Sequence, residues 1–261
     1  MAFKFSLGCV LILTCVVNSV HAGAVFEEGK CRLGNAEACF NLAYDYDMAE
    51  GSQRNYKKAN EYYLKACDLD YSSACYNLAQ NYMNGNGTPE DPTYATELYV
   101  RGCELGSASS CINGGLNFEQ GNGVEVDYER AAKLYKKACE LDEGLGCSNL
   151  GILYENGNSV PKSYTKANSL YQKACDLKEG AGCGFLGANY EQGLALEVDL
   201  NKANELYRRG CELDDGYSCN SLGVNYVQGI GLEIDTEKAK ALFLKGCELS
   251  FDEACSNADL L

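Results

Sequence analysis

The apolar positions of the chain return in the same register every 36 residues. In one such unit Ala131, Leu134, Tyr135, Ala138 and Leu141 recur at helical spacing and form a single apolar stripe. Three positions of the unit keep their residue type almost throughout. They hold Ala59, Ala95, Ala131, Ala167, Ala203 and Ala239; Tyr46, Tyr82, Phe118, Tyr154, Tyr190 and Tyr226; and Tyr63, Tyr99, Tyr135, Tyr171, Tyr207 and Phe243. A fixed period of this size is typical of a repeat solenoid.

Each unit predicts two helices joined by a short loop. The first helix runs from the Cys111 position to the Phe118 position, and Gly121 and Gly123 follow it, where a helix can end in the left-handed conformation. The second helix begins after a position that holds only residues able to cap a helix N-terminus. These residues are Asn55, Asp91, Asp127, Ser163, Asp199 and Asp235. Stacked hairpins of this kind predict an all-α fold, a right-handed α/α solenoid.

The period also sets the expected domain organisation. Six full repeats span residues 38–253. Half-repeats at 23–37 and 254–261 are expected to cap the two ends, because a terminal repeat has a neighbour on one side only.

The segment 1–22 has the pattern of a cleavable signal peptide. Lys4 precedes an apolar run that ends at Val17, and small residues lead up to Ala22. The run is shorter than the ~20 residues that span a bilayer. We therefore expect cleavage after Ala22, a periplasmic or secreted mature protein, and no membrane insertion after cleavage.

Fourteen of the 16 cysteines follow the 36-residue period, in pairs eight residues apart. The pairs are Cys31 with Cys39, Cys67 with Cys75, Cys103 with Cys111, Cys139 with Cys147, Cys175 with Cys183, Cys211 with Cys219, and Cys247 with Cys255. Zinc ligands are usually closer together in sequence, and the one histidine, His21, lies in the signal segment. We expect seven local disulfides, each joining the end of a second helix to the start of the next first helix, and no metal ion or other cofactor.

The charge balance argues against nucleic acid or an anionic membrane as a partner. The chain has 22 Lys and Arg against 37 Asp and Glu, a formal net charge of −15. Proteins that bind those polyanions carry clustered basic residues. We expect a monomer whose acidic surface adds at most a bias towards basic partners.

Two stretches carry a resemblance to a known family. They are Leu222-Gly223, Tyr226 and Gly229 in one helix and its loop, and Asp199, Lys202-Ala203 and Leu206-Tyr207 in another. This pattern resembles the Sel1-like repeat, a relative of the tetratricopeptide repeat. With its cysteine pair in every repeat, the chain is similar to the Helicobacter cysteine-rich protein family of exported proteins.

The resemblance implies two activities of different classes. Sel1-like arrays are scaffolds that bind a protein or peptide, which includes cell-wall peptides. The cysteine-rich family is also described as penicillin-binding or as β-lactamases, so β-lactam binding or hydrolysis is the alternative. A serine β-lactamase needs a Ser-x-x-Lys motif, and the chain has one, Ser163 to Lys166. Both residues fall on ordinary repeat positions, which favours a helix cap over a nucleophile.

For the scaffold, the candidate contacts are carboxamides on the first helices. They can donate and accept hydrogen bonds, which suits an extended peptide backbone. If the first helices line the concave side, stacking would align two rows of them. One row holds Asn81, Asn117, Asn189 and Asn225, and the other holds Asn84, Gln120, Asn156, Gln192 and Gln228. We expect both rows to contact a partner.

Overall fold

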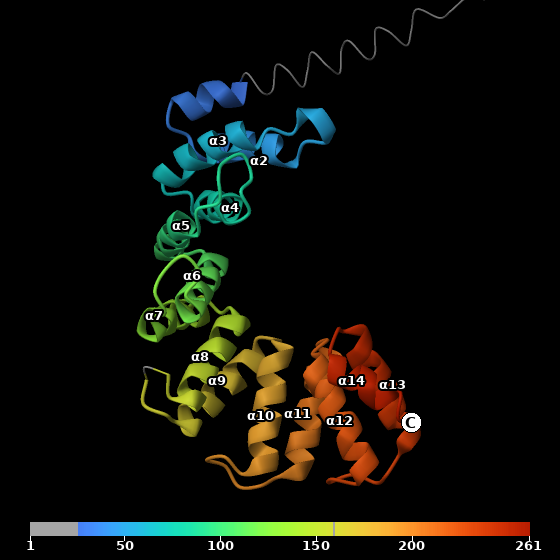
Figure 1. Ribbon diagram of the computed structural model, residues 1–261. Coiled ribbons are helices and arrows are strands. Elements are labelled where there is room, and N and C mark those ends of the chain that lie inside the picture. Colours follow the sequence, from blue (N-terminus) through green and yellow to red (C-terminus); the bar gives the residue numbers. More distant parts are fainter. Residues whose placement is uncertain (1–25, 159) are drawn as a thin grey trace, which may run out of the picture. The chain divides into compact units, whose positions relative to one another are not determined.

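The computed structural model describes residues 26–158 and 160–261, which form helices joined by short turns (Figure 1). After a helix at 26–32 the elements are α2 (Ala36–Met48), the short 3-10 helix η1 (Gly51–Gln53), α3 (Tyr56–Asp68), α4 (Ser72–Met83), α5 (Pro92–Glu104), α6 (Ala108–Gln120), α7 (Tyr128–Glu140), α8 (Gly144–Asn156), α9 (Tyr164–Asp176), α10 (Gly180–Gln192), α11 (Leu200–Glu212), α12 (Gly216–Gln228), α13 (Thr236–Glu248) and α14 (Asp252–Ala258). No strand occurs in these two ranges, and none of their helices is long and apolar enough to cross a membrane. The predicted array of helix hairpins is confirmed. The signal segment lies outside the described residues.

The even-numbered helices are the first helices of the repeats, and the odd-numbered ones are the second helices. The chain folds into two compact units, unit 1 ending at Ser110 and unit 2 running from Cys111 to Leu261. In unit 2 the described residues of successive first helices contact one another more extensively than those of successive second helices do. The first helices of unit 2 therefore lie on the inner side of its curve. We call the surface formed by the first helices of unit 2, which are the C-terminal part of α6 (residues 111–120), α8, α10, α12 and α14, the first-helix face.

The second helices begin where the capping pattern predicts. The side chain of Asp91 accepts a hydrogen bond from the Tyr94 backbone N–H at 2.9 Å, and Ser163 accepts one from Lys166 N–H at 3.3 Å. The first helices of unit 2 end as predicted too. Gly157, Gly193 and Gly229 close α8, α10 and α12 in the left-handed conformation, with φ between 71° and 78°.

Alanine and tyrosine form the core between the helices. Every alanine of the recurring position is fully buried, and Tyr63, Tyr135, Tyr171 and Tyr207 are at most 1% exposed. In unit 2 the aromatic ring of each second helix lies against a glycine of the first helix. A Cβ added at Gly151 would stand 2.5 Å from Cε1 of Tyr171, which shows how closely α8 and α9 approach.

Disulfides close turns from a second helix to the next first helix. Six have Cα–Cα distances from 4.5 to 4.8 Å across a separation of eight residues. They join Cys31 with Cys39, Cys67 with Cys75, Cys139 with Cys147, Cys175 with Cys183, Cys211 with Cys219, and Cys247 with Cys255. Cys103 and Cys111 are disulfide-bonded as well.

The six pairings are those that the sequence predicts, so the cysteines act as structural cross-links. The second cysteine of each pair lies one turn inside the following first helix. Cys39, Cys75, Cys147 and Cys219 are fully buried there. Cys255, in α14, is partly exposed.

Candidate functional site

The first predicted row of carboxamides is buried. Asn81, Asn117, Asn189 and Asn225 are only 2–6% exposed. The amide of Asn189 donates to Oδ1 of Asn168 in the preceding second helix at 2.6 Å, and Asn168 donates to the backbone oxygen of Leu194 at 2.8 Å. The same chain of bonds joins Asn81, Asn60 and the Asn86 carbonyl in unit 1, and Asn225, Asn204 and the Ile230 carbonyl in unit 2.

This burial corrects the expectation that the first row contacts a partner. In the three bonded cases the asparagines hold the loop after a first helix against the preceding second helix, satisfying a carbonyl that would otherwise lack a hydrogen bond. Their side chains are not available at the surface. The sequence shows the recurring asparagine but not the second asparagine, on a neighbouring helix, that binds it.

The second row of carboxamides is exposed. Asn84, Gln120, Asn156, Gln192 and Gln228 all lie at the C-terminal ends of first helices, with their side chains open to solvent. Gln228 also borders a cavity of about 150 Å³ on the first-helix face, between Val224 and Val227 of α12 and Asn257 of α14. These five residues remain candidate partner contacts.

Tyrosine–carboxylate pairs, which the sequence pattern did not predict, lie beside this row. In unit 2 the hydroxyl groups of Tyr135, Tyr171 and Tyr207 donate to Oε2 of Glu119, Glu155 and Glu191 at 2.6, 2.8 and 2.7 Å. In unit 1 the Tyr63 hydroxyl donates to Asp47 at 3.0 Å and accepts from the Asn77 amide at 3.2 Å.

Burial and the adjacent carboxylate both raise the pKa of these tyrosines above the ordinary phenol value. The phenols therefore stay protonated and keep donating. A signal for the pairs exists in the sequence, since Asp47, Glu119, Glu155 and Glu191 share one repeat position. Where that position holds Val227, the partner is Phe243 and the two pack as apolar groups.

Ser163 and Lys166, the candidates for β-lactam chemistry, serve the helix. Ser163 caps α9 through the backbone N–H of Lys166. The Lys166 ammonium lies over the ring of Tyr154, 4.8 Å from its centroid. Lys58, Arg130 and Lys238 occupy the equivalent position and lie over Tyr46, Phe118 and Tyr226 in the same way. Both residues thus do what their repeat equivalents do.

In the part of the chain that the structure describes, no group of three or more His, Cys, Asp or Glu side chains could hold a metal ion. The cysteines are engaged with each other, and the carboxylates of the tyrosine pairs are one repeat apart.

Comparison with known proteins agrees with this architecture. The model of the Sel1 repeat matches residues 36–71, 72–107, 108–143, 144–179, 181–215 and 216–251. No curated protein sequence matches the chain. Among solved structures, a protective antigen of uropathogenic Escherichia coli with an SLR fold is 27% identical with a TM-score of 0.80, over 90% of this chain and 50% of the antigen. The chain therefore spans half the length of that antigen.

Two further structures are similar. A Sel1 repeat protein of Oxalobacter formigenes is 25% identical with a TM-score of 0.73, over 82% of this chain and 85% of that one. Cysteine-rich protein B of Helicobacter pylori is 36% identical over 50% of this chain and 94% of its own, with a TM-score of 0.42. With six matching repeats across most of its length, this chain belongs to the Sel1 repeat family.

Proposed function

We propose that this protein is an exported scaffold that binds an extended segment of another protein along its first-helix face. The observation that carries the proposal is the exposed row of carboxamides in unit 2, Gln120, Asn156, Gln192 and Gln228, at one position of successive repeats. The Sel1 repeat fold is commonly used for protein interaction, which supports the same reading.

The chemistry of this face suits a peptide backbone. Each carboxamide offers a donor and an acceptor, as each peptide unit of an extended segment does. The carboxylates of Glu119, Glu155 and Glu191 use one oxygen for a tyrosine. Their other oxygens can accept from Lys or Arg side chains of the segment, so we expect partners with basic residues.

Export is supported by the disulfides. Cysteines paired in every repeat belong to an oxidising compartment, since the cytosol keeps thiols reduced. The proposed route is the signal peptide at 1–22, cut after Ala22. Mass spectrometry of the protein recovered outside the cytoplasm tests this, and a mature chain beginning at Gly23 is the expected result.

Selection from a random peptide library on the purified oxidised protein tests the binding proposal. Replacing Gln120, Asn156, Gln192 and Gln228 together by alanine should lower the affinity for the selected peptides at least about tenfold, roughly 1.4 kcal/mol in binding free energy. The melting temperature should stay unchanged, because these side chains are exposed.

The matched control replaces four exposed residues at one position of the second helices, Glu129, Thr165, Asn201 and Glu237, by alanine. This variant should bind the selected peptides like the original protein. Equal binding by the carboxamide variant, or a selection that yields no peptide, would contradict the proposal.

A further inference from the structure

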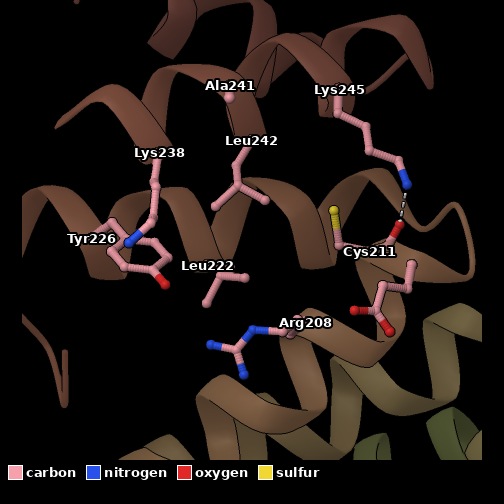
Figure 2. A pocket seen from close by; sticks show the side chains of 9 residues that line it. Arg208, Cys211, Leu222, Tyr226, Lys238, Ala241, Leu242 and Lys245 are labelled. Atoms are coloured by element: carbon pink, nitrogen blue, oxygen red, sulfur yellow. Dashed lines mark hydrogen bonds between the residues drawn. The ribbon is translucent and has the colours of Figure 1, made fainter. Parts of the chain in front are cut away.

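A pocket of about 370 Å³ opens on the side of unit 2 opposite the first-helix face (Figure 2). It is lined by the second helices α11 and α13 and by α12, which lies between them. Its floor is apolar and consists of Leu222 and Tyr226 from α12 and Leu242 from α13. Ala241 lies at its edge, where a small side chain leaves the entrance open. This volume falls in the range of small-molecule sites.

Cations surround this apolar floor. Arg208, Lys238 and Lys245 line the pocket, against Glu212 as the one anion among its lining residues. Figure 2 shows the Arg208 guanidinium extending towards Leu222 and the Lys238 ammonium beside the Tyr226 ring. Although the whole chain has a net charge of −15, cations outnumber anions among the residues that line this pocket.

The three cations differ in what already neutralises them. Lys245 donates to the Cys211 carbonyl at 2.6 Å and pairs with Asp214 at 3.1 Å. Lys238 pairs with Asp235 at 2.9 Å. Arg208 makes no hydrogen bond or ion pair with the residues that the structure describes, so its guanidinium is available to an incoming anion.

The pocket is repeated two hairpins earlier, with a volume of about 320 Å³. There Leu150, Tyr154 and Leu170 form the floor, and Ser169 takes the place of Ala241. We call the two the outer pockets. Their floor leucines on the second helices, Leu170 and Leu242, are both partly exposed.

The cations of this second pocket are Lys136 and Lys166, which take the places of Arg208 and Lys238. Lys136 lies 3.6 Å from a carboxylate oxygen of Glu140, and both side chains are more than 60% exposed. An exposed pair at this distance is weak, so Lys136 can turn towards an anion in the pocket at little cost.

The repeat between them has a different set of side chains. Glu205 stands where the outer pockets have Ala241 and Ser169, and it pairs with Lys202 at 3.0 Å. Gln172 stands where they have Arg208 or Lys136, and it bonds to Asp176. The equivalent leucine, Leu206, is only 3% exposed. A small residue, a cation and an uncovered leucine therefore occur together in the outer pockets, and all three are changed in the repeat between them.

We propose that the outer pockets bind small carboxylates with an aliphatic chain. The aliphatic chain of the ligand would lie on the leucine and tyrosine floor, and its carboxylate would pair with Arg208 in one pocket and Lys136 in the other. The apolar floor suits an aliphatic group, and the cation suits a negatively charged group. A neutral or a cationic amphiphile matches the floor but not the cation. These sites are separate from the first-helix face and independent of the peptide that binds there.

Octanoate, octanol and octylamine form a matched set of probes. Isothermal titration calorimetry of the oxidised protein should show two sites for octanoate, with octanol weaker by about tenfold because a charge-assisted hydrogen bond is lost. Octylamine should bind more weakly still. Octanol binding as tightly as octanoate, or no octanoate binding below the solubility limit, would overturn the proposal.

The substitutions that test the pockets each introduce the residue found at the equivalent position of another repeat of this protein. Ala241→Glu and Ser169→Glu copy Glu205, which the fold already accepts, and each should remove one octanoate site, with none left in the double variant. Arg208→Gln copies Gln172 and should weaken one site while leaving octanol binding unchanged. Ala241→Ser copies Ser169 and is the control that should bind normally.

Two measurements keep the outcome clear. Thermal unfolding followed by circular dichroism reports whether a variant folds. Two octanoate sites remaining in a folded double variant would place binding elsewhere and refute the proposal. The carboxamide variant of the first-helix face should bind octanoate normally, so failure of one proposal leaves the other standing.

Discussion

At the scale of single residues, the turn after each second helix imposes the same backbone on unlike side chains. Gly34, Asp70, Gly106, Asp142, Lys178, Asp214 and Ser250 all have positive φ, from 58° to 92°. Glycine adopts this conformation without steric strain, and Asp tolerates it through local hydrogen bonds. Lys178, with φ of 66°, has neither advantage.

Replacing Lys178 by glycine should therefore stabilise the protein. Glycine removes the strain of the left-handed conformation, but it also gives the unfolded chain more conformational freedom. The net gain in the free energy of unfolding is about 0.5–1 kcal/mol. Urea unfolding measures it. Lys178→Ala is the control and should give no gain, because alanine keeps the Cβ; a loss of stability in the glycine variant would contradict the argument.

The buried and exposed carboxamides should respond oppositely to the same substitution. Asn189→Ala removes the donor to Asn168 and leaves buried polar groups unsatisfied, so it should destabilise by about 1–3 kcal/mol. Gln192→Ala, one turn along the same helix, should change stability by less than about 0.5 kcal/mol. Urea unfolding of both variants checks the contrast, and equal effects would mean that the two rows are not distinct.

At the scale of helices, the sequence specifies the boundaries well because they depend on local chemistry. Caps such as Asp127 and Ser163 act on a backbone N–H three residues away, and the glycines after the first helices act within one turn. The sequence does not specify the rotation of each helix about its axis in the same way. Asn189 and Gln192 are three residues apart on α10, and only the packing of the neighbouring helices decides that the first is buried and the second exposed.

The tyrosine–carboxylate pairs were missed for the same reason. Tyr171 follows Glu155 by 16 residues, and their contact depends on how the hairpin closes over Gly151. The period reveals that both positions recur, but it carries no distance between them. Contacts within one turn of a helix, and the disulfides across the short turns between helices, could be predicted, whereas the other contacts between helices required the structure.

Substitutions of Ser163, the cap of α9, test whether this residue has a structural or a catalytic role. Ser163→Ala should destabilise by about 0.5–2 kcal/mol, and Ser163→Asp should restore stability because other repeats use Asp here. Hydrolysis of a chromogenic β-lactam should be the same for all three proteins. Hydrolysis by the original protein that the alanine variant lacks would make Ser163 a nucleophile and contradict the cap as its role.

At the scale of the whole molecule, the repeated phenols make stability depend on alkaline pH. Burial, and for most of them a carboxylate, raises the pKa of Tyr63, Tyr99, Tyr135, Tyr171 and Tyr207. The folded molecule holds protons that the unfolded chain releases above about pH 10. The stabilising contribution is complete below that pH and is lost as pH rises above it.

The free energy of unfolding should therefore be flat between about pH 8 and pH 10 with respect to these groups and fall steeply beyond, by up to about 1.4 kcal/mol per pH unit for each phenol. Urea unfolding across this range measures the slope. Tyr207→Phe should make it shallower, and an unchanged slope in that variant would mean that Tyr207 ionises equally in both states.

The disulfides have a consequence for chain cleavage. Each one bridges a turn, so a protease that cuts between Cys175 and Cys183 opens a loop that the bond already closes. The two fragments stay joined, and their helices keep their neighbours on both sides. Such a nick would appear on a reducing gel and leave migration on a non-reducing gel nearly unchanged. At these turns the continuity of the molecule rests on two covalent routes, and a single cut removes one of them.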